Sequence, residues 1–223
     1  MSYYNRRPDI SNGLAYDIET IPISDDELTD IQKEEINRKL EKSLERDPKL
    51  EETAERHKIM SLNPMFGKII CFGLGHKDGG KWHEHSIIGD EDHILKEFWR
   101  IISDFRGTFV SFNGISFDAP FINVRSMKHR IRISNKSFID TKRYQIHPQF
   151  DLKQIVADWD KYKATNLRCL CDHLGVPSPK EEGIEASQVY QAYLDGRIDD
   201  IAAYCLRDVR STYDNYEIVR DYK

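Results

Sequence analysis

The sequence has no long apolar run and few cysteines. No stretch of its 223 residues approaches the roughly 20 apolar residues that a membrane-spanning helix requires. The segment Met1–Pro8 also lacks the apolar region of a signal peptide. These absences argue against a membrane protein or a secreted one, and they predict a cytoplasmic location.

The four cysteines show no paired framework: Cys71, Cys169, Cys171 and Cys205. We expect them to remain reduced, as cytosolic thiols do. Cys169 and Cys171 make a poor metal site, because residues two apart do not share a helix face and no second ligand pair follows at zinc-finger spacing. His83 and His85 would share one face of a strand, but no third ligand stands nearby, so we expect a solvated strand.

Charge is abundant but unevenly distributed. Charged residues make up 32% of the chain and its net charge is −5, which argues weakly against a broad nucleic-acid-binding surface. One stretch contains Asp140 as its only acid and is otherwise basic: Arg125, Lys128, Arg130, Arg132, Lys136, Lys142 and Arg143. This stretch either flanks the acidic centre described below or forms a solvated basic helix.

The pattern of apolar residues predicts an α/β core. Strands are expected at 14–18, 68–76, 82–88 and 108–112. Helices are expected at 91–105, 117–129, 167–174, 187–194 and 198–222. A hairpin followed by a helix, a strand and another helix indicates a mixed sheet with helices packed on it.

Residues 24–58 differ from the rest of the chain. They are dense in charge of both signs, nearly free of aromatic residues and interrupted at Asp47-Pro48. The plain interpretation is a pair of solvated helices inserted between the first two strands. The alternative is a lid or clamp over a substrate groove.

Four acidic residues and one tyrosine carry the strongest functional signal. Asp17 and Glu19 are two apart in a predicted strand, so both point to one face. Tyr204 and Asp208 are four apart in a predicted helix and also share a face, while Asp118 follows a neighbouring predicted strand. Hard divalent cations prefer oxygen ligands, and a pair of them can clamp the attacking and leaving oxygens of a phosphodiester. The five residues therefore predict a two-metal site.

These residues lie in three motifs that resemble those of the 3′–5′ exonuclease superfamily with four catalytic acids. The first is Asp17-Ile18-Glu19, the second Asn113–Asp118 and the third Tyr204–Asp208. The histidine-bearing branch of that superfamily would place a histidine where this chain has Ala203. The chain thus looks like the tyrosine-bearing branch.

Further segments narrow the resemblance to predicted exonucleases related to the proofreading domain of B-family DNA polymerases. They are Asn63–Ile69, Phe117–Phe121 and Asp151-Leu152, and the likeness runs from about Gly13 to Val219. It implies a ribonuclease-H-like α/β fold with a central five-stranded mixed sheet flanked by helices. It also implies one exonuclease domain over residues 1–223, with a charged helical insertion at about 24–58.

The resemblance assigns a role to each residue of the motifs. Two divalent cations, Mg²⁺ or Mn²⁺, are implied, with Asp17 bridging them. Glu19 and Asp208 would complete the first metal site, and Asp118 would hold the second cation through water. Tyr204 would orient the attacking water.

Substrate contacts are expected from three further positions. Asn113 would lie near the 3′ end of the substrate, Phe117 would present its ring to a base, and Thr20 directly follows the first motif. The implied partner is nucleic acid with a free 3′ end, with single-stranded DNA favoured and RNA possible.

The implied reaction is metal-dependent hydrolysis from the 3′ end. One alternative is a catalytically idle nucleic-acid-binding module of the same fold, although such modules usually lose one or more of the acids. Another is an endonuclease of the ribonuclease-H type, against which Asn113 and Tyr204 speak.

Overall fold

A computed structural model describes residues 10–178 and 183–223 of the chain. The segment Met1–Pro8, which bears on the signal-peptide expectation, lies outside the described residues. None of the described helices is long and apolar enough to span a membrane.

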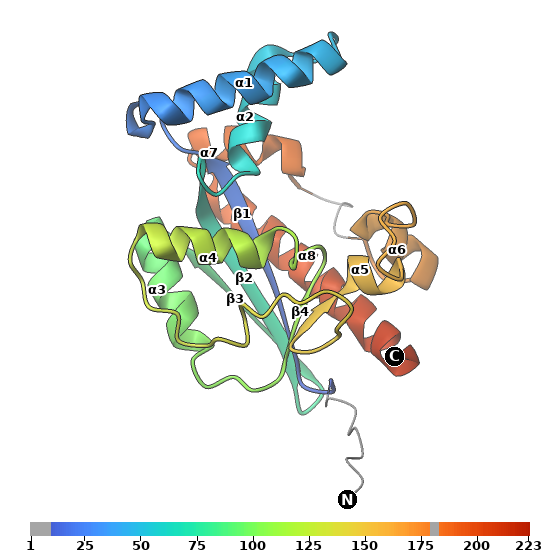
Figure 1. Cartoon of the computed structure of the whole chain (residues 1–223). Helices are drawn as coiled ribbons and strands as arrows, with labels where there is room; N and C mark the ends of the chain where they lie inside the picture. Colours follow the sequence, from blue (N-terminus) through green and yellow to red (C-terminus); the bar gives the residue numbers. More distant parts are fainter. Residues whose placement is uncertain (1–9, 179–182) are drawn as a thin grey trace, which may run out of the picture.

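A mixed five-stranded sheet forms the centre of the described residues (Figure 1). Its strands are β1 (Gly13–Pro22), β2 (Gly67–Asp78), β3 (Lys81–Ile88), β4 (Thr108–Ser111) and β5 (Gln149–Asp151). The strand order is β3-β2-β1-β4-β5. The β1, β2 and β3 strands pair antiparallel, whereas β4 and β5 run parallel to β1. This arrangement confirms the predicted fold class.

Helices cover both faces of the sheet. They are α1 (Asp30–Arg46), α2 (Glu52–Ser61), α3 (Glu91–Ile101), α4 (Asp118–Lys128), α5 (Leu152–Val156), α6 (Leu167–Leu174), α7 (Val189–Leu194) and α8 (Ile198–Val219). The predicted helix over 167–174 is confirmed, because Asn166 caps its first turn and Gly175 ends it with a φ of 69°. The β5 strand and α5 were not predicted, since three and five residues are too short to show a period.

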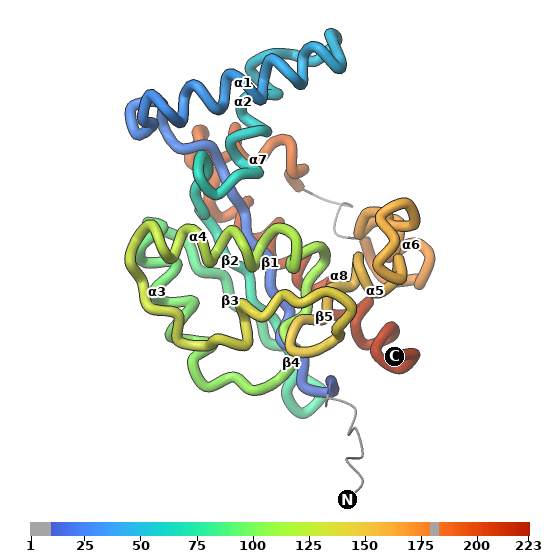
Figure 2. Tube along the Cα trace, viewed as in Figure 1, coloured from blue at the N-terminus to red at the C-terminus, as the bar shows by residue number. Residues whose placement is uncertain are grey.

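The two faces of the sheet have separate cores. Leu14, Tyr16 and Ile18 of β1 belong to a cluster with the buried residues of α3 and α4. Ala15 belongs instead to a cluster with Val209, Tyr213 and Tyr216 of α8. The tube in Figure 2 shows the consequence: α8 lies beside β1 although the two are at opposite ends of the chain.

The charged insertion forms two helices, as predicted. The α1 helix ends at Arg46, directly before the expected break at Asp47-Pro48, and α2 follows. Thr29 caps α1 with a reciprocal bond to Gln32. In Figure 1 the pair lies above the sheet, and α2 contacts β1.

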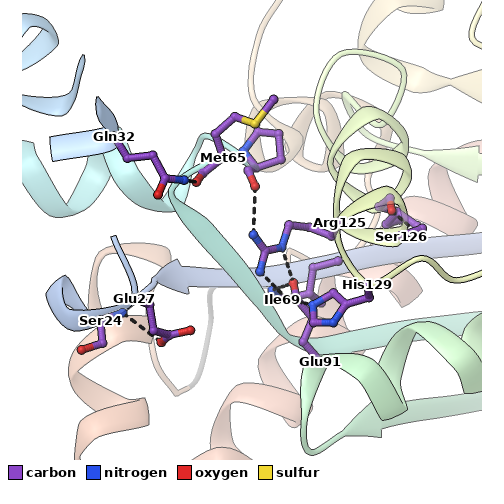
Figure 3. A network of polar contacts seen from close by, with 11 residues as sticks. Ser24, Glu27, Gln32, Met65, Ile69, Glu91, Arg125, Ser126 and His129 are labelled. Atoms are coloured by element: carbon purple, nitrogen blue, oxygen red, sulfur yellow. Dashed lines mark hydrogen bonds and ion pairs between the residues drawn. The ribbon is translucent and has the colours of Figure 1, made fainter. Parts of the chain in front are cut away.

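A buried ion pair joins α3 to α4 (Figure 3). Arg125 donates from Nε and Nη2 to the Glu91 carboxylate at 2.8 and 2.5 Å, with 4% and 6% of the two side chains exposed. Glu91 also accepts the backbone N–H of Ile69 at 2.8 Å and contacts His129, while Arg125 donates to the Pro64 carbonyl at 3.1 Å. Arg125 is thus a structural residue, which corrects its inclusion in a basic surface beside the acids.

Candidate active site

Strand β1 presents its acidic residues to α8. Side chains alternate along a strand, so Asp17 and Glu19 face the same side as Ala15, which packs against α8. The β1 strand pairs with β4 only as far as Ala15, so both acids lie beyond the end of β4. The register between β1 and β2 shifts between Glu19 and Thr20, a strand irregularity of the kind often found beside active sites.

A glycine lets α8 approach the strands closely. Gly73 of β2 pairs with Asp17, and a Cβ at Gly73 would lie 2.8 Å from Cys205 Sγ and 2.9 Å from Val209 Cγ2. The Cys205 thiol lies 3.6 Å from the carbonyl oxygen of Asp17 and 3.7 Å from its Oδ2. The close approach places the third motif beside the first.

Tyr204 and Asp208 lie one helical turn apart on α8 and face the acids of β1. Tyr204 is 4% exposed. Burial first, and then the charges of Asp208, Glu19 and Asp17, raise its pKa far above the ordinary value. The phenol therefore keeps its proton at neutral pH and remains a hydrogen-bond donor beside the carboxylates.

Asp118 approaches from the other side of β1. It is the first residue of α4, is 3% exposed, and its Oδ1 accepts the backbone N–H of Ile18 at 3.2 Å. Burial raises the pKa of Asp118 to about 7, and the charges of Asp151 and Asp208 add to the rise against the backbone hydrogen bonds.

Asp151 holds the loop that leads to Asp118. Its carboxylate accepts the backbone N–H groups of Asn113 at 2.9 Å and Ile115 at 3.1 Å. Asn113 has a φ of 78°, a left-handed conformation that asparagine tolerates better than most residues. Gly114 also has no room for a side chain, since a Cβ would lie 2.3 Å from Ser111 Oγ. The backbone conformation at Asn113 and the close packing at Gly114 therefore favour these two residue types, independently of any contact with substrate.

Four carboxylates and the tyrosine therefore gather at one point. Burial first, and then the charges of Asp118, Glu19 and Asp208, raise the pKa of Asp17 well above its ordinary value. Glu19 shows the same rise, with Asp208 the largest charge acting on it. Among the described residues, no lysine or arginine forms an ion pair with Asp17, Glu19 or Asp118. The excess of negative charge suits bound cations.

The donor set fits a hard divalent cation. Among the described residues, Asp17, Glu19 and Cys205 bring ligand atoms within 4.8 Å of one another. A hydrogen bond with Cys71, followed by burial, raises the pKa of Cys205 well above its ordinary value, and a protonated thiol is a poor metal ligand. The carboxylate oxygens remain, and these are the ligands that Mg²⁺ and Mn²⁺ prefer.

Comparisons with known proteins agree with this geometry. Residues 83–220 match the family described as predicted 3′–5′ exonucleases related to the exonuclease domain of PolB. The chain belongs to this family. The matched segment contains the second and third motifs. An uncharacterized protein of Methanocaldococcus jannaschii is 30% identical over 173 residues, which cover 72% of this chain and 90% of the relative.

The fold of this chain is also found within a larger enzyme. The family B DNA polymerase from the hyperthermophilic archaeon Pyrobaculum calidifontis superposes with a TM-score of 0.62 at 19% identity. The similarity covers 95% of this chain but 25% of the polymerase, so the chain spans about a quarter of the polymerase's length. At this identity the match shows the fold, which is ribonuclease-H-like.

The exonuclease-family chain has a pocket next to the acids. The pocket has a volume of about 790 Å³, and it is lined by Glu19, Thr20, Leu62, Phe117, Tyr190 and other residues. Its walls come from β1, α2 and α7. Phe117 also packs against Phe121, with 5.5 Å between ring centroids, and Thr20 donates to the Ser61 carbonyl at 2.8 Å. The α2 helix of the insertion is thus a wall of the pocket.

Sequence reasoning assigned no site role to Cys205 or to Asp151, although Asp151-Leu152 is one of the segments that carry the resemblance. Cys205 lies three residues before Asp208, a helical spacing that places both on one face. Asp151 ends β5 and caps α5, a position at which an aspartate before an apolar residue is a recognisable signal. The histidines of the solvated strand, His83 and His85, are exposed on β3, and Cys171 accepts a hydrogen bond from Asn215.

The raised pKa values predict that the metal-free protein loses stability as the pH rises. When the pKa of a carboxyl group is higher in the folded state than in the unfolded state, its protonation stabilises the folded state. This stabilisation is complete below the pKa of the unfolded state, about 4, and it is lost as the pH rises through the pKa of the folded state. For Asp118 the folded pKa is about 7. We expect the melting temperature in EDTA to fall between about pH 5 and pH 8, and Mg²⁺ to restore it.

Asp118→Asn provides the control for this pH dependence. The variant cannot ionise at this position, so its melting temperature should fall less steeply over the same interval. An equal slope in the variant and the wild type would contradict the assignment to the acidic cluster.

Proposed function

We propose that the protein is a metal-dependent 3′–5′ exonuclease that hydrolyses phosphodiester bonds at the 3′ end of nucleic acid. Single-stranded DNA is the favoured substrate and RNA the alternative. The observation that carries the proposal is the convergence of Asp17, Glu19, Asp118 and Asp208 with Tyr204 at one point beside the sheet. Membership of the exonuclease family supports it.

The acids would hold two divalent cations, Mg²⁺ or Mn²⁺. Asp17 would bridge the two sites, with Glu19 and Asp208 at one and Asp118 at the other. When bound, the cations supply Lewis-acid stabilisation of the charge that develops on the phosphodiester. Binding of cations also offsets the mutual repulsion of the carboxylates, so it should stabilise the folded chain.

The remaining residues of the site position the reactants. The protonated phenol of Tyr204, beside Asp208, would hold the attacking water in a hydrogen bond. Phe117 and Thr20 line the pocket, where the ring of Phe117 would contact the 3′-terminal base. Asn113, in the loop that leads to Asp118, would contact the substrate near its 3′ end.

The direct test uses a single-stranded oligonucleotide labelled at its 5′ end. A ladder that shortens from the 3′ end in the presence of Mg²⁺ or Mn²⁺ is expected, with nucleoside monophosphates as product. Cleavage of a circular substrate would instead indicate an endonuclease of the ribonuclease-H type. Binding without cleavage in either metal would indicate an idle nucleic-acid-binding module.

Replacing Tyr204 with phenylalanine should slow cleavage more than it weakens metal binding. The variant keeps the buried ring but loses the hydroxyl beside Asp208, and partners around a metal site typically contribute about 10- to 100-fold. We expect kcat to fall within this range, while the Mn²⁺ affinity measured by calorimetry changes less. Tyr213→Phe, on the same helix but packed against Trp82, is the matched control. Equal losses in rate and in Mn²⁺ affinity would contradict the water-orienting role.

A further inference from the structure

A second depression lies on the other side of the Asp118 loop. It has a volume of about 890 Å³ and is lined by Asn113, Ser116, Arg143, Lys153, Lys161 and Asn166, among others. We call it the cationic groove. Ser116 lines this groove, Phe117 lines the pocket described above, and Asp118 follows directly. The pocket and the cationic groove are therefore lined by adjacent residues of the Asp118 loop, and Glu19 of the acidic cluster lines the pocket.

The cations of the groove are available to a ligand. No aspartate or glutamate is among the residues that line the cationic groove. Within the described part of the chain, Arg143, Lys153 and Lys161 form no ion pair within 4.0 Å, and each could therefore contact an anion. Nearby cations differ, because Lys142 pairs with Asp140 at 3.1 Å and Lys163 with Asp160 at 3.9 Å.

Exposed aromatic rings accompany these cations. Tyr144 and Tyr162 are 74% and 87% exposed, far more than is usual for tyrosines of a folded core. The Arg143 guanidinium lies 5.9 Å from the centroid of the Tyr144 ring, and Lys161 Nζ lies 5.0 Å from that of Tyr162. Interleaved cations and exposed rings are the combination with which proteins bind single-stranded nucleic acid.

The backbone is strained at Tyr144 and at Trp159, whose ring lies beside that of Tyr144. Tyr144 has a φ of 65° and Trp159 a φ of 62°, and the two rings lie 5.3 Å apart. Bulky residues rarely adopt the left-handed conformation, and such strain concentrates at ligand-binding sites. The loops 141–148 and 157–166, which carry the rings, thus hold them at the surface at a conformational cost.

The geometry points to the cationic groove as the binding site for the single-stranded segment on the 5′ side of the bond that is cut. This inference rests on the proposed exonuclease function. An enzyme that releases a 3′-terminal nucleotide has to hold that nucleotide on one side of its acids and the remaining strand on the other. The pocket suits the terminal nucleotide, because Glu19, Glu51 and Glu55 line it against a single lysine, Lys58, and an excess of acids disfavours a run of phosphates. The cationic groove suits the remaining strand, with phosphates on Arg143, Lys153 and Lys161 and bases on Tyr144 and Tyr162.

The first test measures binding without catalysis. The variant Arg143→Gln/Lys153→Gln/Lys161→Gln is compared with Lys136→Gln/Lys142→Gln/Lys163→Gln, which removes three exposed cations that do not line the groove. Fluorescence anisotropy in EDTA, with labelled oligo-dT and oligo-rU of equal length, gives the Kd at several salt concentrations. We expect the groove variant to raise Kd about tenfold or more and to reduce the salt slope by about 2, since each phosphate contact contributes roughly 0.7 for single strands. The control variant should change either quantity much less.

Comparing the binding of oligo-dT, oligo-rU and a blunt duplex shows which form of nucleic acid the groove recognises. The expected loss applies to both oligo-dT and oligo-rU, because the phosphodiester backbone is common to both. Tyr144→Ala/Tyr162→Ala should weaken single-strand binding about fivefold or more and leave binding of a blunt duplex nearly unchanged. An equal loss for duplex and single strand would contradict the inference.

The second test separates this inference from the proposed function. On a long single strand the groove variant should raise KM with little change in kcat, and on a trinucleotide it should resemble the wild type. If the wild type does not cleave, the proposed function fails while the binding measurement still decides on the groove. If the wild type cleaves and the groove variant matches the control variant in Kd and KM, the groove inference is wrong.

Discussion

Replacing Asp17 with asparagine is expected to abolish cleavage and the stabilisation by divalent cations together. Asparagine keeps the shape of the side chain but removes the negative charge at the centre of the cluster. Losing even an outer partner of a metal ligand typically costs about 10- to 100-fold, so losing a bridging ligand should lower kcat/KM by more than about 100-fold. The measurements are the end-labelled oligonucleotide assay and the melting temperature with and without Mn²⁺.

A matched substitution on α8 controls for the change in net charge. Asp199→Asn removes one exposed carboxylate from the first turn of this helix. It should retain both the activity and the shift in melting temperature. Asp17→Asn should also be no less stable than the wild type without metal, because it removes one of the repelling charges. Cleavage by Asp17→Asn at a rate near that of the wild type would overturn the catalytic assignment.

The largest loss of stability is expected from Arg125→Met. Methionine leaves the Glu91 carboxylate buried without its partner, and breaking a buried ion pair in this way costs about 3–5 kcal/mol of unfolding free energy. Burial raises the pKa of Glu91, but the hydrogen bond and charge of Arg125 outweigh it and leave the pKa below its ordinary value. Urea or guanidinium unfolding at neutral pH gives the free energy directly.

Two further variants test the origin of that loss. Lys128→Met removes an exposed cation from the same helix and should change the free energy of unfolding by less than about 0.5 kcal/mol. The double variant Glu91→Leu/Arg125→Met replaces both charges with apolar groups and should recover much of the loss. A loss below about 1 kcal/mol for Arg125→Met, or a double variant less stable than Arg125→Met, would contradict the account.

The acids of the candidate site could be predicted from the sequence because each motif is short and the period of its strand or helix fixes the motif's geometry. Residues two apart in a strand, or four apart in a helix, lie on the same face of that element, and this does not depend on how the rest of the chain folds. The pairings that bring Asp17, Asp118 and Asp208 together follow from the order of strands and helices. The roles assigned to these residues remain predictions.

The misses arise where tertiary structure decides. Arg125 carries the same formal charge as its neighbours in sequence, and only the packing of α4 on α3 shows that it is buried against Glu91. The separation of Lys153 and Lys161 from Arg143 in sequence likewise hid the cationic groove, because the loops 141–148 and 157–166 and the helix α5 meet there only in the folded chain. The distribution of charge along the sequence therefore indicated a basic region, but it did not show which of the cations lie together in the cationic groove.

The close approach of α8 to β1 across Gly73 has a consequence for the order in which the protein is made. Asp17 and Cys205, whose atoms lie 3.7 Å apart, are 188 residues apart in sequence. At the usual speed of translation the ribosome needs roughly 10–40 s to produce that length of chain. A nascent chain therefore carries two of the acids long before the helix that supplies the fourth has emerged. The cluster of four acids cannot form until α8 has been synthesised, so a growing chain would lack any activity that depends on all four of them.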